Sequence, residues 1–118
     1  MTFIQQLIKE SKPAPYPLEL EKVAGSLAIR YQGVWMVLDL CESYAYIVRI
    51  RVPKKRQGKG LGGAALKWLC RTADQHKISL QLHPSTGDCR MTNKALRAWY
   101  HRNCFRPLKS GMVREPSA

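Results

Sequence analysis

The chain has 118 residues, a length that accommodates one domain and excludes a two-domain enzyme. Hydrophobic residues make up 45% of it and charged residues 24%, a balance that predicts a folded core and excludes wholesale disorder. Twenty Lys and Arg residues against eight Asp and Glu residues give a formal net charge of +12, which indicates an anionic partner.

The four cysteines, at positions 41, 70, 89 and 104, form no C-x-x-C pair, so the spacing excludes zinc-finger and dithiol redox motifs. No stretch reaches the roughly 18 consecutive apolar residues of a membrane span. The first ten residues mix apolar side chains with Gln, Lys and Glu, unlike a signal peptide. We therefore expect a reduced, cytoplasmic protein without a metal site or membrane association.

The beginning of the chain predicts a helical arm and a stiff connector. Thr2 can cap a short helix whose apolar residues recur at helical spacing, so residues 1–12 form the expected arm. Three prolines within 13–17 predict an extended connector. We expect one domain over 1–118 that includes both segments.

The hydrophobic pattern then alternates, as in a half-buried sheet. Residues 26–31 and 34–40 predict two antiparallel strands, joined by a hairpin turn at Gln32 and Gly33. Residues 44–52, rich in β-branched and aromatic side chains, predict a central strand.

A basic, glycine-rich loop over 53–63 separates this strand from a helix expected over 64–75. Residues 78–82 predict another strand, and the helical crossover before it should place it parallel to 44–52.

A final helix, capped by Thr92, should run to about Asn103 with Leu96, Trp99 and Tyr100 on its buried side. A short strand is expected over residues 111–114. These elements predict an α/β (α+β) fold with a mixed, largely antiparallel sheet flanked by helices.

The glycine-rich loop predicts an anion site, because a glycine turn before a helix exposes backbone N–H groups at the positive end of the helix dipole. A Walker A motif needs Ser or Thr after Gly-Lys, but Gly60 follows Lys59. Gly58, Gly60 and Gly63 fit G-x-G-x-x-G, but His83 stands where the acidic ribose-binding residue is expected. An ordinary strand-to-helix turn remains the alternative.

The segment Gln57-x-x-Gly60-x-Gly62 resembles the pyrophosphate loop of the GNAT superfamily of N-acetyltransferases. Val52 lies five residues before Gln57, which is the family's spacing. Pro53 follows Val52 directly, whereas the family places this proline one residue later.

The last helix carries the second part of the resemblance. Family members have Asn, then Tyr seven residues later, then Gly-Phe; here Asn93, Tyr100, Cys104 and Phe105 stand in that register, with Cys in place of Gly. The resemblance extends over 27–105 and implies a GNAT-like fold in which the two parallel strands splay apart.

The resemblance also implies the chemistry. Acetyl-CoA would be the cosubstrate, a primary amine would attack its thioester directly, no metal would be needed, and Tyr100 would be the general acid. Contacts with the cofactor are implied for Ile50, Arg51, Val52, Arg56, Gln57, Gly58, Lys59, Gly60, Leu61, Gly62, Gly63, Asn93 and Tyr100.

The general base is less defined, since the strand over 44–52 contains no carboxylate. Glu42, Asp39 and His83 are expected at strand ends near the reaction site. His83 has the ordinary pKa best suited to neutral pH.

Coenzyme A, with about four negative charges, neutralises only part of the positive surplus. We therefore expect a protein lysine, a protein N-terminus or a nucleic-acid-associated acceptor rather than a polyamine. A basic nucleic-acid-binding module and a coenzyme A sensor without catalysis remain alternatives. Family members usually carry two helices between their first two strands, whereas the clear helix expected here lies in residues 1–12. We therefore expect either an unusually open site or a site that a second copy closes, as a homodimer.

Overall fold

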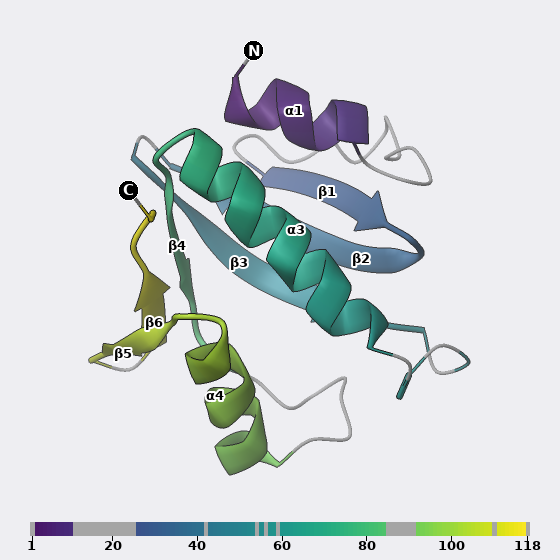
Figure 1. The fold of residues 1–118 in the computed structure, drawn as a ribbon, viewed down its shortest axis with the longest axis vertical. Helices are drawn as coiled ribbons and strands as arrows, with labels where there is room; N and C mark the ends of the chain where they lie inside the picture. Colours follow the sequence, from purple (N-terminus) through teal and green to yellow (C-terminus); the bar gives the residue numbers. More distant parts are fainter. Residues whose placement is uncertain are drawn as a thin grey trace.

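The computed structural model describes residues 2–10, 26–41, 43–53, 55, 57–58, 60–84, 92–109 and 111–117. The predicted 13–17 connector lies outside these ranges. In chain order the elements are α1 (Phe3–Glu10), β1 (Ser26–Tyr31), β2 (Val34–Leu40), β3 (Tyr44–Arg51), α3 (Leu61–Gln75), β4 (Ser79–Leu82), α4 (Asn93–Arg102), β5 (Arg106–Leu108) and β6 (Gly111–Arg114) (Figure 1).

The strands form one six-stranded sheet in the order β1-β2-β3-β4-β6-β5. Strands β3 and β4 pair in parallel, and the other neighbouring pairs are antiparallel. The mixed, largely antiparallel sheet expected from the sequence is therefore confirmed. Strand β5 was not expected, because three residues that include Pro107 are too few to show an alternating pattern.

Local signals in the sequence account for the first elements. Thr2 Oγ1 accepts a hydrogen bond from Gln5 N at 3.1 Å, and Gln5 Oε1 accepts one from Thr2 N at 2.9 Å, so the two residues cap α1 reciprocally. Gln32 and Gly33 both have positive φ, 50° and 83°, as a two-residue hairpin turn requires. The predicted cap and turn are both confirmed.

Several boundaries differ from those expected. Helix α3 begins at Leu61, three residues before the expected start at 64, because Gly62 and Gly63 lie inside its first turn. Strand β3 ends at Arg51 and β4 begins at Ser79, each one residue inside its expected range.

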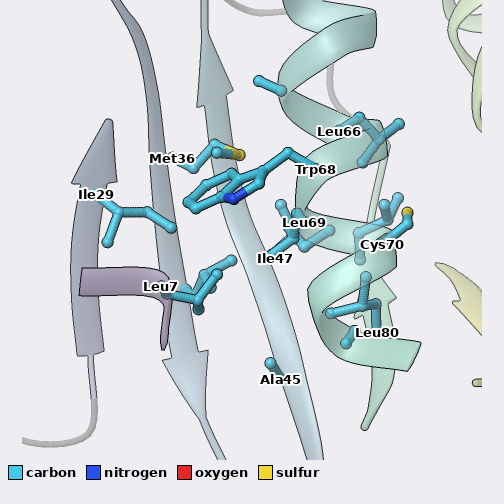
Figure 2. Packing of buried hydrophobic residues seen from close by; sticks show 14 of the residues in the cluster. Leu7, Ile29, Met36, Ala45, Ile47, Leu66, Trp68, Leu69, Cys70 and Leu80 are labelled. Carbon is cyan, nitrogen blue, oxygen red and sulfur yellow. The ribbon is translucent and has the colours of Figure 1, made fainter. Parts of the chain in front are cut away.

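Helices α1 and α3 cover one face of the sheet (Figure 1). Leu7 from α1 and Trp68 from α3 point toward Ile29, Met36 and Ile47 of the sheet, as Figure 2 shows. Burying these side chains supplies the main driving force for folding, about 1.5–3 kcal/mol for each large apolar side chain.

The C-terminal strand is fixed to α3 by an ion pair. Arg114 Nη1 and Nη2 donate to the two carboxylate oxygens of Asp74 at 2.7 and 2.9 Å, and Arg114 Nε donates to Asn103 O at 3.2 Å. The Arg114 side chain is only 8% exposed, so this bidentate pair is largely removed from solvent. Within the described ranges, no helix is both long and apolar enough to cross a bilayer.

Candidate functional site

The two parallel strands separate partway along β3. Their pairing runs from Tyr44 and Ser79 to Ile47 and Leu82, where β4 ends, while β3 continues to Arg51. Beyond Ile47, the described strands offer β3 a partner on its β2 side only. The N–H and C=O groups on the opposite edge of this part of β3 can therefore bind an extended ligand.

A bulge in β3 coincides with this separation. Leu38 of β2 pairs with Ile47 and Val37 pairs with Arg49, so Val48 is an extra residue on β3. The burial alternation breaks at the same place, and Val48 is 50% exposed. The bulge thus bends β3 where the parallel pairing stops.

The loop after β3 leads directly into the N-terminus of α3. Gly60 is the N-cap residue, with φ of 75°, and no side chain caps the helix. Gly58 also has a left-handed φ, 81°, which favours glycine. A Cβ built at Gly58, Gly60 or Gly63 would meet nothing within 4 Å. No side chain therefore caps the first-turn N–H groups, which lie at the positive end of the helix dipole.

The side chain of Gln57 bridges the base of this loop, since its Nε2 donates to Val52 O at 3.0 Å. Val52 also lies close to the start of α3, because a Cβ added at Gly62 would be 3.2 Å from Val52 Cγ2. The five-residue spacing between Val52 and Gln57 thus corresponds to a direct contact.

Helix α4 places Tyr100 in a rigid aromatic setting. Thr92 Oγ1 caps the helix by accepting from Ala95 N at 3.1 Å, as expected. The buried Tyr100 ring lies 4.9 Å from the Trp99 ring and 5.4 Å from the Phe105 ring, measured between centroids. Packing against these two rings restricts the direction of the tyrosine ring.

Cys104 stands where the family has Gly, and it has φ of 71°. The left-handed conformation therefore forms although the residue carries a Cβ. Its N–H donates to His101 O at 3.0 Å, and Phe105 N donates to Tyr100 O at 3.1 Å. These two hydrogen bonds close the C-terminus of α4 and bring Phe105 against Tyr100.

Trp99 was not expected in the site, although it directly precedes Tyr100. A Cβ at Gly62 would lie 4.0 Å from Trp99 Cζ2, so this indole joins α4 to the glycine-rich loop. Asn103 Nδ2 donates to Trp99 O at 2.9 Å. The signals in the sequence were its predicted place on the buried side of the last helix and its position beside Tyr100.

Some of the remaining predicted site residues lie near the point where β3 and β4 separate, and others lie away from it. His83 is exposed and directly follows Leu82, where the parallel strands separate. Asp39 pairs with Tyr46 across β2 and β3, so β3 lies between it and β4. Of the predicted cofactor contacts, Ile50 and Leu61 are half-buried, and Arg51 and Asn93 are exposed. Glu42, Arg56 and Lys59 lie outside the described residues.

In the part of the chain that the structure describes, no three His, Cys, Asp or Glu side chains are grouped as metal ligands would be.

Residues 3–104 match the sequence model of the acetyltransferase (GNAT) family. Among curated proteins, none matches the chain significantly in sequence.

Several solved structures are similar. The ribosomal-protein-S18-alanine N-acetyltransferase from Escherichia coli is 16% identical, with a TM-score of 0.63, and the match covers 98% of this chain and 87% of that one. The anti-CRISPR protein AcrVA5 is 21% identical, with a TM-score of 0.61, over 75% of this chain and 97% of that one. YhhK from E. coli, bound to coenzyme A, is 13% identical, with a TM-score of 0.56, over 96% and 86% of the two chains.

At these identities the structural likenesses show the shared fold, while the family match covers most of the sequence. The chain belongs to the GNAT family of acetyltransferases, enzymes that transfer an acetyl group from acetyl-CoA to an amine.

Proposed function

We propose that this protein acetylates a primary amine on a protein, either a lysine or an N-terminus. The observation that carries the proposal is the open, uncapped N-terminus of α3, which directly follows the end of β3 where the parallel pairing stops. The N–H groups at the start of α3 can bind phosphate oxygens, and the edge of β3 beyond the end of β4 can bind an extended chain.

The glycine-rich loop fits the diphosphate of coenzyme A. The N–H groups from Gln57 to Gly63 supply donors, and the open space at Gly58, Gly60 and Gly63 admits phosphate oxygens. The hydrogen bond from Gln57 Nε2 to Val52 O stabilises the conformation of the loop. Arg56 and Lys59 add positive charge to this segment.

Acetyl-CoA supplies the activated acetyl group as a thioester. The backbone of Ile50, Arg51 and Val52 pairs with the pantetheine arm, because this edge of β3 lies beyond the end of β4. A backbone N–H near Ile50 would donate a hydrogen bond to the thioester oxygen as negative charge develops there. Asn93, at the start of α4, is assigned to the cofactor arm.

Proton transfer falls to Tyr100 and His83. Tyr100 donates a proton to the departing thiolate, and its packing against Trp99 and Phe105 restricts the direction of the hydroxyl. His83, at the end of β4, accepts the proton of the attacking amine. Glu42 remains a second candidate for the base.

A protein acceptor is favoured by two observations. The +12 charge opposes a polyamine acceptor, which is itself cationic. Among proteins of similar fold, the E. coli enzyme is described as acting on an alanine of a ribosomal protein. Because fold does not fix substrate, the second observation supports the choice only by analogy.

Replacement of Tyr100 by Phe tests the proposal. We expect kcat for acetyl transfer to a protein acceptor to fall about 10²-fold, while the acetyl-CoA Kd changes less than about threefold. Thiol release measures turnover, mass spectrometry of the acceptor detects the acetyl group, and calorimetry measures Kd.

The matched control is Tyr31→Phe, since Tyr31 stacks on Trp68 at 4.6 Å in the core, on another part of the molecule. Equal turnover in wild type and Tyr100→Phe would exclude Tyr100 as the acid. Absence of thiol release from the wild type with every protein acceptor would reject the proposed function.

A further inference from the structure

The side chain of Trp99 connects α4 with the first turn of α3. Gly62 lies in that turn, and a Cβ added there would be 4.0 Å from Trp99 Cζ2 and 3.2 Å from Val52 Cγ2. The end of β3, the start of α3 and the indole therefore meet at Gly62. A glycine at this position allows the three elements to approach one another closely.

The same indole contacts the proposed acid. The centroids of the Trp99 and Tyr100 rings are 4.9 Å apart, and the two ring planes are tilted by 54°. Consecutive residues of a helix do not face each other, so their position on α4 does not by itself bring the two rings together. One side chain thus lies against the start of α3, where we place the diphosphate, and against Tyr100.

Trp99 is itself held at its backbone and at its ring. Asn103 Nδ2 donates to Trp99 O at 2.9 Å, and the half-buried indole packs against the core cluster. The buried Tyr100 ring also contacts Phe105, whose ring centroid is 5.4 Å away. Because protein interiors are closely packed, removal of the indole would leave space into which the Tyr100 ring can move.

We infer that Trp99 is a positioning residue for acetyl transfer, which sets the place of the Tyr100 hydroxyl relative to the amides at the start of α3. This inference rests on the proposed function. A diphosphate bound at those amides also determines where the sulfur of the cofactor lies, so the proton donor must keep a set position relative to them. A misplacement of about 1 Å can lower a rate about 10²-fold.

A double-mutant cycle separates this role from simple packing. We expect Trp99→Leu, which keeps an apolar side chain but no ring, to lower kcat about 30-fold and to change the acetyl-CoA Kd less than about threefold. In the Tyr100→Phe background the same replacement should change kcat less than about twofold, because a residue that acts through the hydroxyl has no effect once the hydroxyl is absent. Trp99→Phe, which keeps a ring beside Tyr100, should recover most of the lost kcat.

The matched control is Trp68→Phe. Trp68 is an indole of the core: its ring stacks on Tyr31 at 4.6 Å, and its Nε1 donates to Glu10 at 2.8 Å. Its replacement should lower the free energy of unfolding in urea, while kcat stays within about twofold of the wild type. A loss of kcat in Trp68→Phe as large as in Trp99→Leu would overturn the inference, because general loss of packing would then explain both.

NMR of the cofactor-free protein with isotope-labelled tyrosine rings gives a readout independent of turnover. The Tyr100 resonances are those that disappear in Tyr100→Phe. In Trp99→Leu they should move toward the values of exposed tyrosines, whereas Trp68→Phe should move mainly the resonances of Tyr31. Unchanged Tyr100 resonances in Trp99→Leu would overturn the inference. Circular dichroism checks folding, and Trp99→Met, a second apolar replacement without a ring, takes the place of Trp99→Leu if that variant does not fold.

The outcomes distinguish failure of this inference from failure of the proposed function. Failure of acetyl-CoA to bind would reject the proposed function, and equal kcat in the wild type and Tyr100→Phe would reject its acid. A large loss in Tyr100→Phe with unchanged kcat in Trp99→Leu would reject the positioning role alone. Losses that multiply in the double variant would also reject it, because Trp99 would then act independently of Tyr100. An acetyl-CoA Kd that rises more than about threefold in Trp99→Leu would make the indole part of the cofactor site instead.

Discussion

Glycines 60, 62 and 63 act in different ways at the N-terminus of α3. Gly60 supplies a left-handed φ, Gly62 avoids a tight contact with Val52, and Gly63 leaves open space beside the helix. The sequence predicted a binding loop here, but it could not separate these roles. The separation depends on backbone angles and on neighbours that only the folded chain provides.

Replacement of Gly63 by Ala should move stability and affinity in opposite directions. Alanine favours the helix, so the free energy of unfolding should rise by about 0.5 kcal/mol. The added methyl group occupies the space left for phosphate oxygens, so the acetyl-CoA Kd should rise about tenfold. Urea denaturation and calorimetry measure the two effects; an unchanged Kd would show that the cofactor does not approach Gly63.

Cys70 should be the least reactive of the described thiols. Burial raises its pKa to about 11, so almost none is thiolate at neutral pH, whereas Cys41 and Cys104 are exposed. With a thiol reagent at pH 8, Cys41 and Cys104 should be labelled in the native state and Cys70 only after unfolding. Peptide mapping by mass spectrometry checks this, and rapid native labelling of Cys70 would contradict the packing of α3.

At the scale of elements, the ion pair between Asp74 of α3 and Arg114 of β6 controls how the C-terminal strand attaches. The hydrogen bond from Arg114 holds the pKa of Asp74 below its ordinary value. A carboxyl whose folded-state pKa is depressed stabilises the fold above its unfolded-state pKa of about 3.9, and this contribution disappears as pH falls through the folded-state pKa.

Asp74→Asn should therefore cost about 2–3 kcal/mol of unfolding free energy at pH 7, since it leaves the guanidinium of Arg114 without its counter-charge. Between about pH 5 and pH 2 the wild type should lose stability more steeply than the variant. Glu115→Gln is the control, because its contact with Arg106 is exposed on both sides. Parallel pH curves for wild type and Asp74→Asn would contradict the role of this pair.

Elements with a regular pattern could be predicted from the sequence, and interruptions of a pattern could not. The alternation over 26–31 and 34–40 gave both strands with the bounds observed in the structure. The bulge at Val48 left no comparable signal, because one extra residue in a run of β-branched and aromatic side chains changes no residue type. Its position follows from pairing with β2.

Prediction of the candidate site from the sequence was likewise partial. The spacing of Val52 and Gln57 indicated the loop and corresponds to a hydrogen bond between them. The contact of Trp99 with Gly62 joins segments far apart in the sequence, so no local pattern could indicate it. The proposed roles of Tyr100 and His83 remain predictions.

At the scale of the whole molecule, the core and the proposed cofactor site share one side of the sheet. The apolar core lies under α1 and α3, and the N-terminus of α3 opens next to it. The positive surplus of the chain exceeds the charge of coenzyme A, so the cofactor alone does not neutralise it.

The proposed function depends on whether backbone amides at the start of α3 bind the diphosphate, and amide NMR during a titration with coenzyme A measures this directly. We predict saturable shifts that are largest for Gly60, Leu61, Gly62 and Gly63, with smaller shifts for Ile50 to Val52. Unchanged amide resonances across the start of α3 at saturating coenzyme A would contradict it.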